Sequence, residues 1–199
     1  MSSTTRPDRL ESRAAAVERT RDRILAVARD RFVELPYDEV RLAEVAAAAG
    51  VTQQTLLNHF ASKEGLLLAL VEVLGAEVDA LRGRVVAGDA AAAVRGLMRQ
   101  YEALGDATVR MTAAAERFPA LAPGLATARD THRAWLAEVF ADQLPADEPA
   151  RRRTLAALSA ATDVGTWKLL RRDLGHSRAE TTTVLAHLVR AALATAPDP

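Results

Sequence analysis

The chain has 199 residues, enough for one or two small domains, with 26 basic and 26 acidic side chains and no cysteine. Its zero net charge argues against a protein that coats nucleic acid, but a local basic face remains compatible with binding one DNA site. The lack of cysteine excludes disulfides and thiolate metal sites, and no apolar run approaches the ~20 residues of a membrane span.

Residues 1–16 lack the apolar segment of a signal peptide, so we expect a mobile N-terminal arm and a cytoplasmic protein. An amphipathic helix is predicted over 20–35, with arginines on its outer face. Its inward positions are Ile24, Leu25, Ala28 and Phe32.

The segment 41–60, RLAEVAAAAGVTQQTLLNHF, predicts two short helices joined by a turn. Gly50 suits the left-handed backbone of such a turn, and Thr52 can cap the second helix. Leu56 and Phe60 are four residues apart and therefore share its inward face. The inward stripe of the first helix is Leu42, Val45, Ala46 and Ala49.

A unit of this kind is either a DNA-binding helix-turn-helix or an ordinary αα-hairpin, because both share the periodicity and the glycine. The polar residues of the second helix favour DNA binding. They are Gln53, Gln54, Asn58 and His59.

Downstream, FASKEGLLLALVEVLG begins a long helix, with Ser62 as N-cap and Glu64 in the first turn. Over about residues 17–80, the runs RDRILAVARDRF, YDEVRLAEVAAAAGV and TQQTLLNHFASKEGLLLA resemble the DNA-binding domain of the TetR family of bacterial regulators. The resemblance implies a helix-turn-helix domain over 17–62, with the start of a fourth helix reaching about residue 80, and a ligand-binding and dimerisation domain over 63–199.

Three positions depart from the family pattern. Pro36 stands where glycine commonly precedes the tyrosine, and Arg41 stands where Ser or Thr often caps the second helix. Leu57 replaces a common tyrosine and with it a phosphate contact. We expect Arg41 to restore some phosphate binding and Leu57 to contact a thymine methyl.

The resemblance implies that Gln53 and Gln54 read base edges, since glutamine pairs well with adenine, and that Asn58 joins them or bonds a phosphate. Lys63 would hold a phosphate at the positive N-terminus of its helix. A two-fold dimer implies a palindromic operator. The candidate DNA-binding residues are Arg41, Thr52, Gln53, Gln54, Thr55, Leu57, Asn58, His59 and Lys63.

The rest of the chain shows helical patterns and no strand alternation, so we predict an all-α protein of nine helices, three in the N-terminal domain and six in the C-terminal domain. Ser177 and Glu180 form a capping box before the last helix. The six C-terminal helices are expected at about 63–86, 89–103, 106–117, 122–143, 149–174 and 177–195, with breaks that include Gly88, Gly105 and Gly175.

The last two predicted helices carry apolar stripes that suit a four-helix bundle across a two-fold axis. The same periodicity also fits packing inside one subunit; the family resemblance favours the dimer. The candidate interface residues are Leu155, Leu158, Thr162, Gly165, Leu169, Val184, Leu185, Leu188 and Ala192.

TetR-like proteins usually hold a small molecule between the middle helices, and here we expect an apolar or amphipathic organic ligand. Aromatic and methionine side chains at helical spacing can equally be core. The candidate ligand-binding residues are Met98, Tyr101, Met111, Phe118, His132, Trp135, Asp163, Thr166 and Trp167.

Neither an enzyme nor a cofactor is expected. The sequence has no phosphate-binding glycine loop, no Ser-His-Asp pattern and no cysteine nucleophile. Its four histidines lack metal-ligand spacing. Two alternatives to a repressor remain, a TetR-like activator and an α-helical adaptor without a DNA role.

Overall fold

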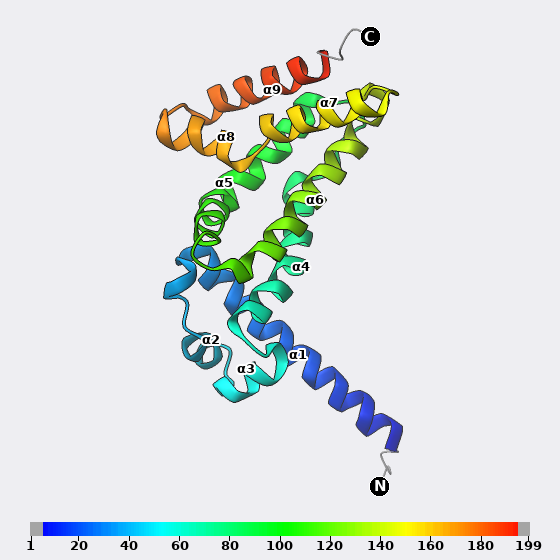
Figure 1. Cartoon of the computed structure of the whole chain (residues 1–199). Coiled ribbons are helices and arrows are strands. Elements are labelled where there is room, and N and C mark those ends of the chain that lie inside the picture. The colour runs from blue at the N-terminus through cyan, green and yellow to red at the C-terminus, as the bar shows by residue number, and fades with distance from the viewer. Residues whose placement is uncertain (1–5, 195–199) are drawn as a thin grey trace. The chain divides into compact units, whose positions relative to one another are not determined.

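The computed structural model describes residues 6–194, with side chains from residue 12 onward, and each regular element in this part is helical. The chain divides into two compact units, Met1–Leu74 and Gly75–Pro199. The boundary falls inside α4, Lys63–Arg82 (Figure 1). The prediction of an all-α protein is confirmed.

The first unit consists of α1 (Arg6–Glu34), α2 (Leu42–Ala48), α3 (Gln53–Phe60) and the first turns of α4. α2 packs against both α1 and α3. The start of α4 belongs with them because its leucines complete their core. The largest side chains of this core are Ile24, Phe32, Tyr37, Leu56, Phe60, Leu66 and Leu70.

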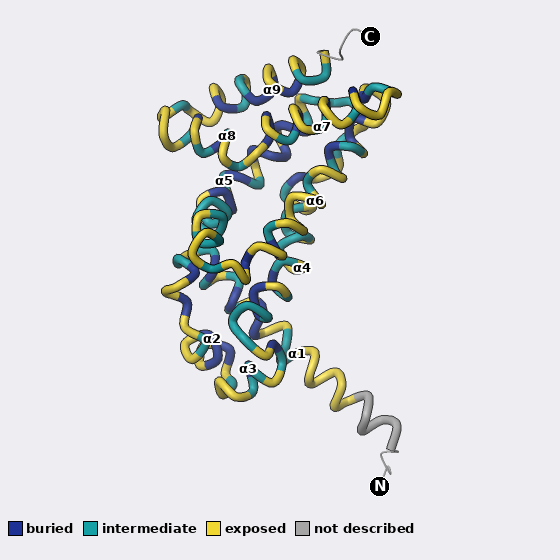
Figure 2. The backbone as a smooth tube through the Cα atoms, in the orientation of Figure 1, coloured by how far each residue is buried: buried dark blue, intermediate teal, exposed yellow. Residues whose placement is uncertain are grey.

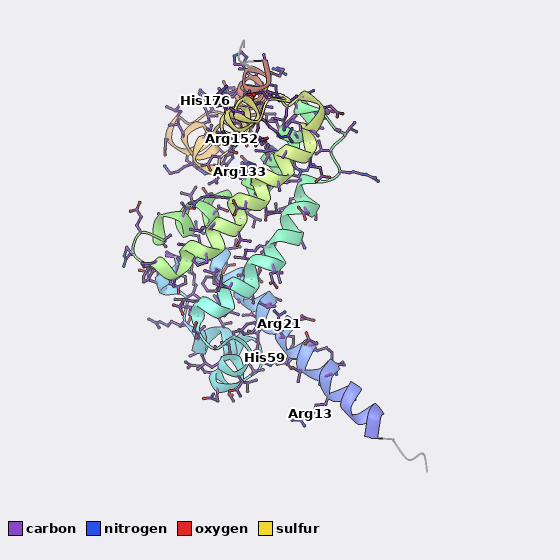
Figure 3. All side chains as sticks on the ribbon, turned by 45° about the vertical axis from the view of Figure 1, so that its right-hand side comes forward. Arg13, Arg21, His59, Arg133, Arg152 and His176 are labelled. Carbon is purple, nitrogen blue, oxygen red and sulfur yellow. The ribbon has the colours of Figure 1, made fainter. Side chains whose placement is uncertain are left out.

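The segment expected as an N-terminal arm is helical from Arg6, where α1 begins, and α1 runs without interruption to Glu34. Pro7 stands in its first turn, where the missing N–H costs no hydrogen bond, and the alanine-rich run that follows favours helix. Residues 1–5 of the arm lie outside the described part. Side chains 12–19 are exposed, and Arg13 projects from this part of α1 (Figures 2 and 3).

The second unit is built from α5 (Ala90–Ala114), α6 (Ala122–Val139), α7 (Glu148–Ala161), α8 (Val164–Lys168) and α9 (Arg178–Ala194). Short 3₁₀ turns, Pro119–Leu121 and Ala141–Gln143, flank α6, and a π-helical turn, Leu169–Asp173, follows α8. α5 packs against α8 and α9, and α7 packs against α6 and α9. Their shared core includes Leu97, Met98, Tyr101, Leu136, Phe140, Leu158, Trp167 and Leu185.

Two predicted boundaries are wrong, in opposite directions. The predicted break at Gly105 is absent, since α5 runs through it; a Cβ there would lie 2.5 Å from the Trp167 ring. The predicted helix 149–174 is instead divided at Asp163, whose carboxylate accepts the Gly165 N–H at 2.7 Å and so caps α8.

The capping box before α9 is confirmed. The Ser177 N–H donates to Glu180 at 2.8 Å, and the Glu180 N–H donates to the Ser177 hydroxyl at 3.1 Å. Within residues 6–194, no helix combines the length and the hydrophobicity that a membrane crossing needs.

Gly65 is predicted to be intolerant of a side chain. In Gly65→Ala the new Cβ would collide with the carbonyl oxygen of Phe60, which is backbone and cannot turn aside. We expect the free energy of unfolding to fall by about 1–3 kcal/mol in urea titrations followed by circular dichroism. Gly75→Ala, in the same helix but with nothing within 4 Å, is the matched control and should stabilise the protein by up to ~1 kcal/mol. Equal effects of the two substitutions would contradict the steric argument.

Candidate functional site

The turn between α2 and α3 is fixed by two backbone hydrogen bonds around Gly50, whose φ is 70°. The Val51 N–H donates to the Ala46 carbonyl at 3.0 Å, and the Gly50 N–H donates to the Ala47 carbonyl at 3.1 Å. This is a Schellman termination, which needs the left-handed conformation that glycine adopts without strain. The sequence prediction for Gly50 is confirmed.

α3 presents a polar outer face because its apolar residues are used inside. Leu56 and Phe60 are buried, and the Arg21 guanidinium of α1 lies 5.7 Å from the centre of the Phe60 ring. Thr52 caps the helix by accepting the Thr55 N–H at 3.1 Å. The exposed residues of α3 are Gln53, Gln54 and Asn58.

The three exposed amides are not equivalent. Gln54 donates from Nε2 to Asn58 Oδ1 at 3.0 Å, so these two side chains hold each other across one turn. Gln53 has no side-chain hydrogen bond to any described residue and is free to meet a ligand. The hydroxyls of Thr52 and Thr55 bond each other at 2.9 Å.

A tight turn links α3 to α4. Ala61 has φ 62° and ψ −45°, and the Ser62 N–H donates across it to the Phe60 carbonyl at 2.7 Å. This is a γ-turn with positive φ, a strained conformation for alanine. The Ser62 hydroxyl then accepts the Gly65 N–H at 3.1 Å and caps α4, as predicted. The turn therefore sets Lys63 immediately after the exposed helix.

Lys63 forms a cation–π contact with the aromatic ring of Tyr37. Its Nζ lies 4.3 Å from the ring centre, and the Tyr37 hydroxyl donates to Glu64 at 2.8 Å. Burial lowers the pKa of Lys63 and raises that of Tyr37, with the bond to Glu64 adding to the second shift. Backbone and side-chain hydrogen bonds, first its own N–H, lower the pKa of Glu64. This role of Tyr37 was not predicted from the sequence.

The remaining candidate DNA-binding residues lie as follows. Arg41 is exposed at the start of α2 and pairs with Glu44 at 3.4 Å. Leu57 and His59 are half-buried, and the His59 ring lies 5.9 Å from that of Phe60 (His59 is labelled in Figure 3). The structure thus gathers all the candidates except Arg41 on α3, its cap and the first residue of α4.

A buried polar cluster lies at the end of α4 in the second unit. Arg82 donates from Nε to Gln100 at 2.7 Å and from Nη2 to Nδ1 of His132 at 2.8 Å. The Nε2–H of His132 then donates to the Thr162 hydroxyl at 2.9 Å. This arrangement requires a neutral imidazole, and burial, followed by the charge of Arg82, lowers the pKa of His132 to about 3.

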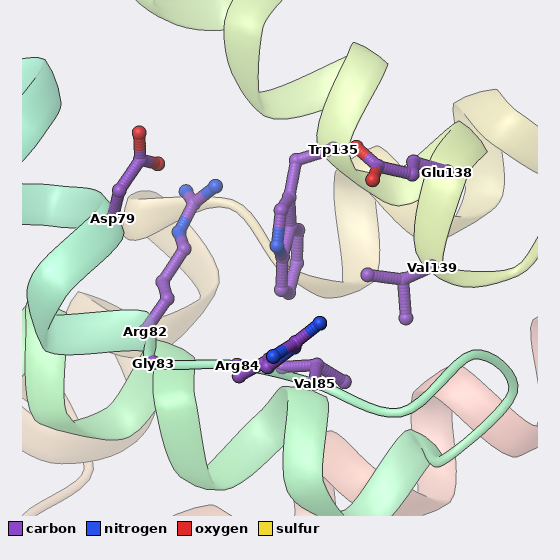
Figure 4. Close-up of a pocket in the computed structure, with 8 residues that line it drawn as sticks. All are labelled: Asp79, Arg82, Gly83, Arg84, Val85, Trp135, Glu138 and Val139. Atoms are coloured by element: carbon purple, nitrogen blue, oxygen red, sulfur yellow. The ribbon is translucent and has the colours of Figure 1, made fainter.

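An open pocket of about 380 Å³ adjoins this cluster (Figure 4). The Arg82 guanidinium lies 4.4 Å from the centre of the Trp135 ring. The pocket is lined by Asp79, Arg82, Gly83, Arg84, Val85, Trp135, Glu138 and Val139. Arg82 was missed by the sequence analysis, although it continues a four-residue spacing of apolar positions, Leu66, Leu70, Leu74 and Val78.

Only Trp135 among the nine candidate ligand-binding residues lines this pocket, and the centre of the His132 ring lies 5.9 Å from that of Trp135. Met98, Tyr101 and Trp167 are core, and the Tyr101 hydroxyl donates to the Thr162 carbonyl at 2.5 Å. Asp163 caps α8, and the Thr166 hydroxyl donates to the Ala160 carbonyl at 2.7 Å. The last two candidates, Met111 and Phe118, are half-buried around the end of α5.

Three of the candidate interface residues face the inside of their own chain. Leu158, Thr162 and Leu185 are at most 1% exposed, because α5, α7 and α9 pack together, and are therefore wrong as interface residues. Gly165, Leu169 and Leu188 are exposed. The half-buried candidates Leu155, Val184 and Ala192 pack against the core. In the described part of the chain, no cluster of three or more His, Asp or Glu side chains could hold a metal ion.

Comparison with known proteins identifies the first unit. Residues 24–70 match the model of the bacterial regulatory proteins of the tetR family, and this match covers the end of α1 through the start of α4. No curated protein matches the chain at a significant level.

Solved structures share the fold. A tetR-family transcriptional regulator from Streptomyces coelicolor has 18% identity and a TM-score of 0.72, over 90% of this chain and 82% of its own. A Mesorhizobium loti MAFF303099 protein assigned to the same family has 19% identity and a TM-score of 0.61, over 89% and 96%. A TetR-family regulator from Streptomyces coelicolor A3 has 25% identity and a TM-score of 0.52, over 91% and 96%. Residues 24–70 therefore carry the helix-turn-helix domain of the tetR family of bacterial regulatory proteins.

Proposed function

We propose that the protein is a homodimeric repressor in the cytoplasm that binds a palindromic operator and is released by a small molecule. The observation that carries the DNA-reading part is the face of α3. Its apolar side chains are buried while Gln53, Gln54 and Asn58 stay exposed. Amide side chains can pair with base edges in the major groove, most readily with adenine.

Gln53 and the Gln54–Asn58 pair would read different bases. Because the hydrogen bond between Gln54 and Asn58 fixes both side chains, they would act as one unit, whereas Gln53 is free to form a bidentate contact. Lys63, Arg41, His59 and the two threonines would contact phosphates and set the position of α3.

The test is selection of bound sequences from a random duplex pool at near-physiological salt. An enriched palindrome would support a dimeric regulator and identify the bases opposite Gln53. Failure to enrich any sequence, with folded and dimeric protein and no ligand present, would contradict the proposal. A transcription assay on the selected operator then separates repressor from activator, which share the same DNA-binding domain.

Lys63→Ala and Gln53→Ala should weaken DNA binding in different ways. Lys63→Ala should weaken binding to all sequences alike and lower the salt slope by about 1, because one phosphate contact is lost. Gln53→Ala should cost about 1–3 kcal/mol on the selected operator and relax one base position, leaving the salt slope unchanged. Titrations at several salt concentrations measure both. A change of base preference in Lys63→Ala without a change of slope would exclude its phosphate role.

The dimer would form through the exposed apolar side chains around α8 and α9. Leu169, Leu174 and Leu188 are 48%, 59% and 37% exposed, and association would remove them from water. We expect Leu188→Glu to weaken the dimer strongly in sedimentation experiments. Val86→Glu is the matched control, because Val86 is 74% exposed in the α4–α5 connection. Equal effects of the two changes would contradict this interface.

Ligand control would operate through α4, which begins at Lys63 and ends at Arg82. A ligand that binds better to the form with low operator affinity shifts the population toward it, and its differential affinity sets the limit of release.

A further inference from the structure

Arg82 is a buried cation without an ion-pair partner among the described residues. It is only 4% exposed, yet it forms no ion pair with any carboxylate of the described residues. Its contacts are the amide of Gln100, the imidazole of His132 and the ring of Trp135. Buried charges are ordinarily paired, since taking an unpaired charge out of water is unfavourable.

The side chains hydrogen-bonded to Arg82 carry no negative charge, and the carboxylate of Asp79 acts on it through space without forming an ion pair. Gln100 does not ionise, and His132 accepts the hydrogen bond from Arg82 as a neutral ring. Asp79 and Glu138 line the pocket but are exposed. Asp79 lies on the far side of Arg82 from Trp135 (Figure 4). Asp79 therefore balances the charge of Arg82 only through space, and no carboxylate of the described residues pairs with the guanidinium directly.

The pocket beside Arg82 has the size and lining for a small organic molecule. Its volume of about 380 Å³ lies in the usual range for such sites, roughly 300–1,000 Å³. Trp135 offers a flat aromatic face, and Val85 and Val139 add apolar surface. Gln100 and His132 use two of the five N–H groups of Arg82, which leaves donors for a carboxylate.

We propose that this pocket binds a small organic carboxylate, whose negative group pairs with Arg82 and whose apolar body lies against Trp135, Val85 and Val139. Binding of the carboxylate is independent of the proposed function, whereas its effect on operator affinity rests on that function. The proposal narrows the apolar or amphipathic ligand expected from the sequence to an anionic one. Binding would act on the last residue of the helix whose first residue is Lys63.

The test is calorimetry on the full-length protein with four carboxylates and their uncharged amides. The probe pairs are benzoate and benzamide, 1-naphthoate and 1-naphthamide, octanoate and octanamide, and decanoate and decanamide. We expect at least one carboxylate to bind about tenfold or more tightly than its amide, because only the acid forms a charge-assisted pair. If no carboxylate binds better than its amide, the proposal is wrong.

Variants locate the binding to Arg82. Arg82→Gln should remove the preference for the acid, whereas Arg84→Gln should keep it, since Arg84 is an exposed arginine of the same pocket. An equal loss in both variants, or none in Arg82→Gln, would overturn the role of Arg82. If Arg82→Gln does not fold, Trp135→Ala is tested in its place. It should weaken the binding of the best carboxylate and of its amide by the same factor, because Arg82 remains to discriminate between them.

Operator binding is measured separately on the selected palindrome. A carboxylate that binds the protein without lowering operator affinity would support the pocket chemistry and contradict ligand release. Selection of a palindrome together with indifference to every carboxylate would support the DNA-binding proposal and overturn this one.

Discussion

Lowering the pH from 7 to 5 is expected to cost the second unit about 2 kcal/mol of unfolding free energy through His132 alone. The pKa of this histidine is lowered from its ordinary value of 6.5 to about 3. Between these values the unfolded chain binds a proton that the folded chain excludes. Stability is therefore complete above about pH 6.5 and falls by up to about 1.4 kcal/mol per pH unit toward pH 3.

The physical reason lies in the groups around the ring. Arg82 donates to Nδ1 from α4, Thr162 accepts from Nε2 at the end of α7, and Trp135 packs against the ring at 5.9 Å. A proton on Nδ1 would break the bond from Arg82 and place two cations together. No compensating carboxylate lies on the ring within the described structure.

The matched control is His132→Gln, since glutamine can both accept from Arg82 and donate to Thr162 but cannot be protonated. Urea titrations at pH 7 and pH 5 should show the loss in the unmodified protein and little of it in the variant. The other histidines and the carboxylates are present in both proteins, so their contributions cancel. Identical pH dependence of the two proteins would contradict the assignment to His132.

Trp167→Ala is expected to lower the free energy of unfolding by about 3–5 kcal/mol, because Trp167 has the largest fully buried side chain of the described residues. Trp167 is fully buried, lies 5.9 Å from the Tyr101 ring and covers the surface left open by Gly105. Its Nε1–H donates to Glu102 at 3.2 Å. Truncation would leave a cavity where α5 and α8 meet.

Trp135 remains as the fluorescent reporter for this measurement, and Trp167→Phe is the control that keeps most of the volume. The phenylalanine variant should lose clearly less stability than the alanine variant. Two ion pairs join the π-helical turn to α5, Arg171 with Glu102 at 2.7 Å and Arg172 with Asp106 at 2.9 Å. They should not compensate for the stability that the alanine variant loses. A loss below about 1 kcal/mol in Trp167→Ala would contradict the packing argument.

Local signals in the sequence predicted the helix-turn-helix correctly. Gly50 ends α2, Thr52 and Ser62 cap the next two helices, and Ser177 with Glu180 begins α9. Each of these interactions joins residues at most five positions apart, so the chain needs no distant partner to form them. The inward positions Leu56 and Phe60 follow from helical periodicity in the same way.

The boundaries that failed depend on distant contacts or on competing local preferences. A glycine such as Gly105 favours a helix break in the sequence, but α5 continues through it because the Trp167 ring occupies the space beside it. Asp163 was placed inside one long predicted helix, but its side chain caps α8 and so divides that helix. α1 begins earlier in the chain than predicted, because a polar segment can be helical without an apolar stripe.

The sequence by itself determined the helical class and the helix-turn-helix, because these depend on spacings of three to five residues, and the runs over about residues 17–80 carried the resemblance to the TetR family. Only the tertiary structure decided which apolar stripes are internal: Leu158 and Leu185 have the periodicity of an interface and lie in the core. It also decided that Arg82, which reads as a surface arginine, is buried against Trp135, Gln100 and His132. Periodicity gives the face of a helix, whereas the partner of that face is set by residues far away in the chain.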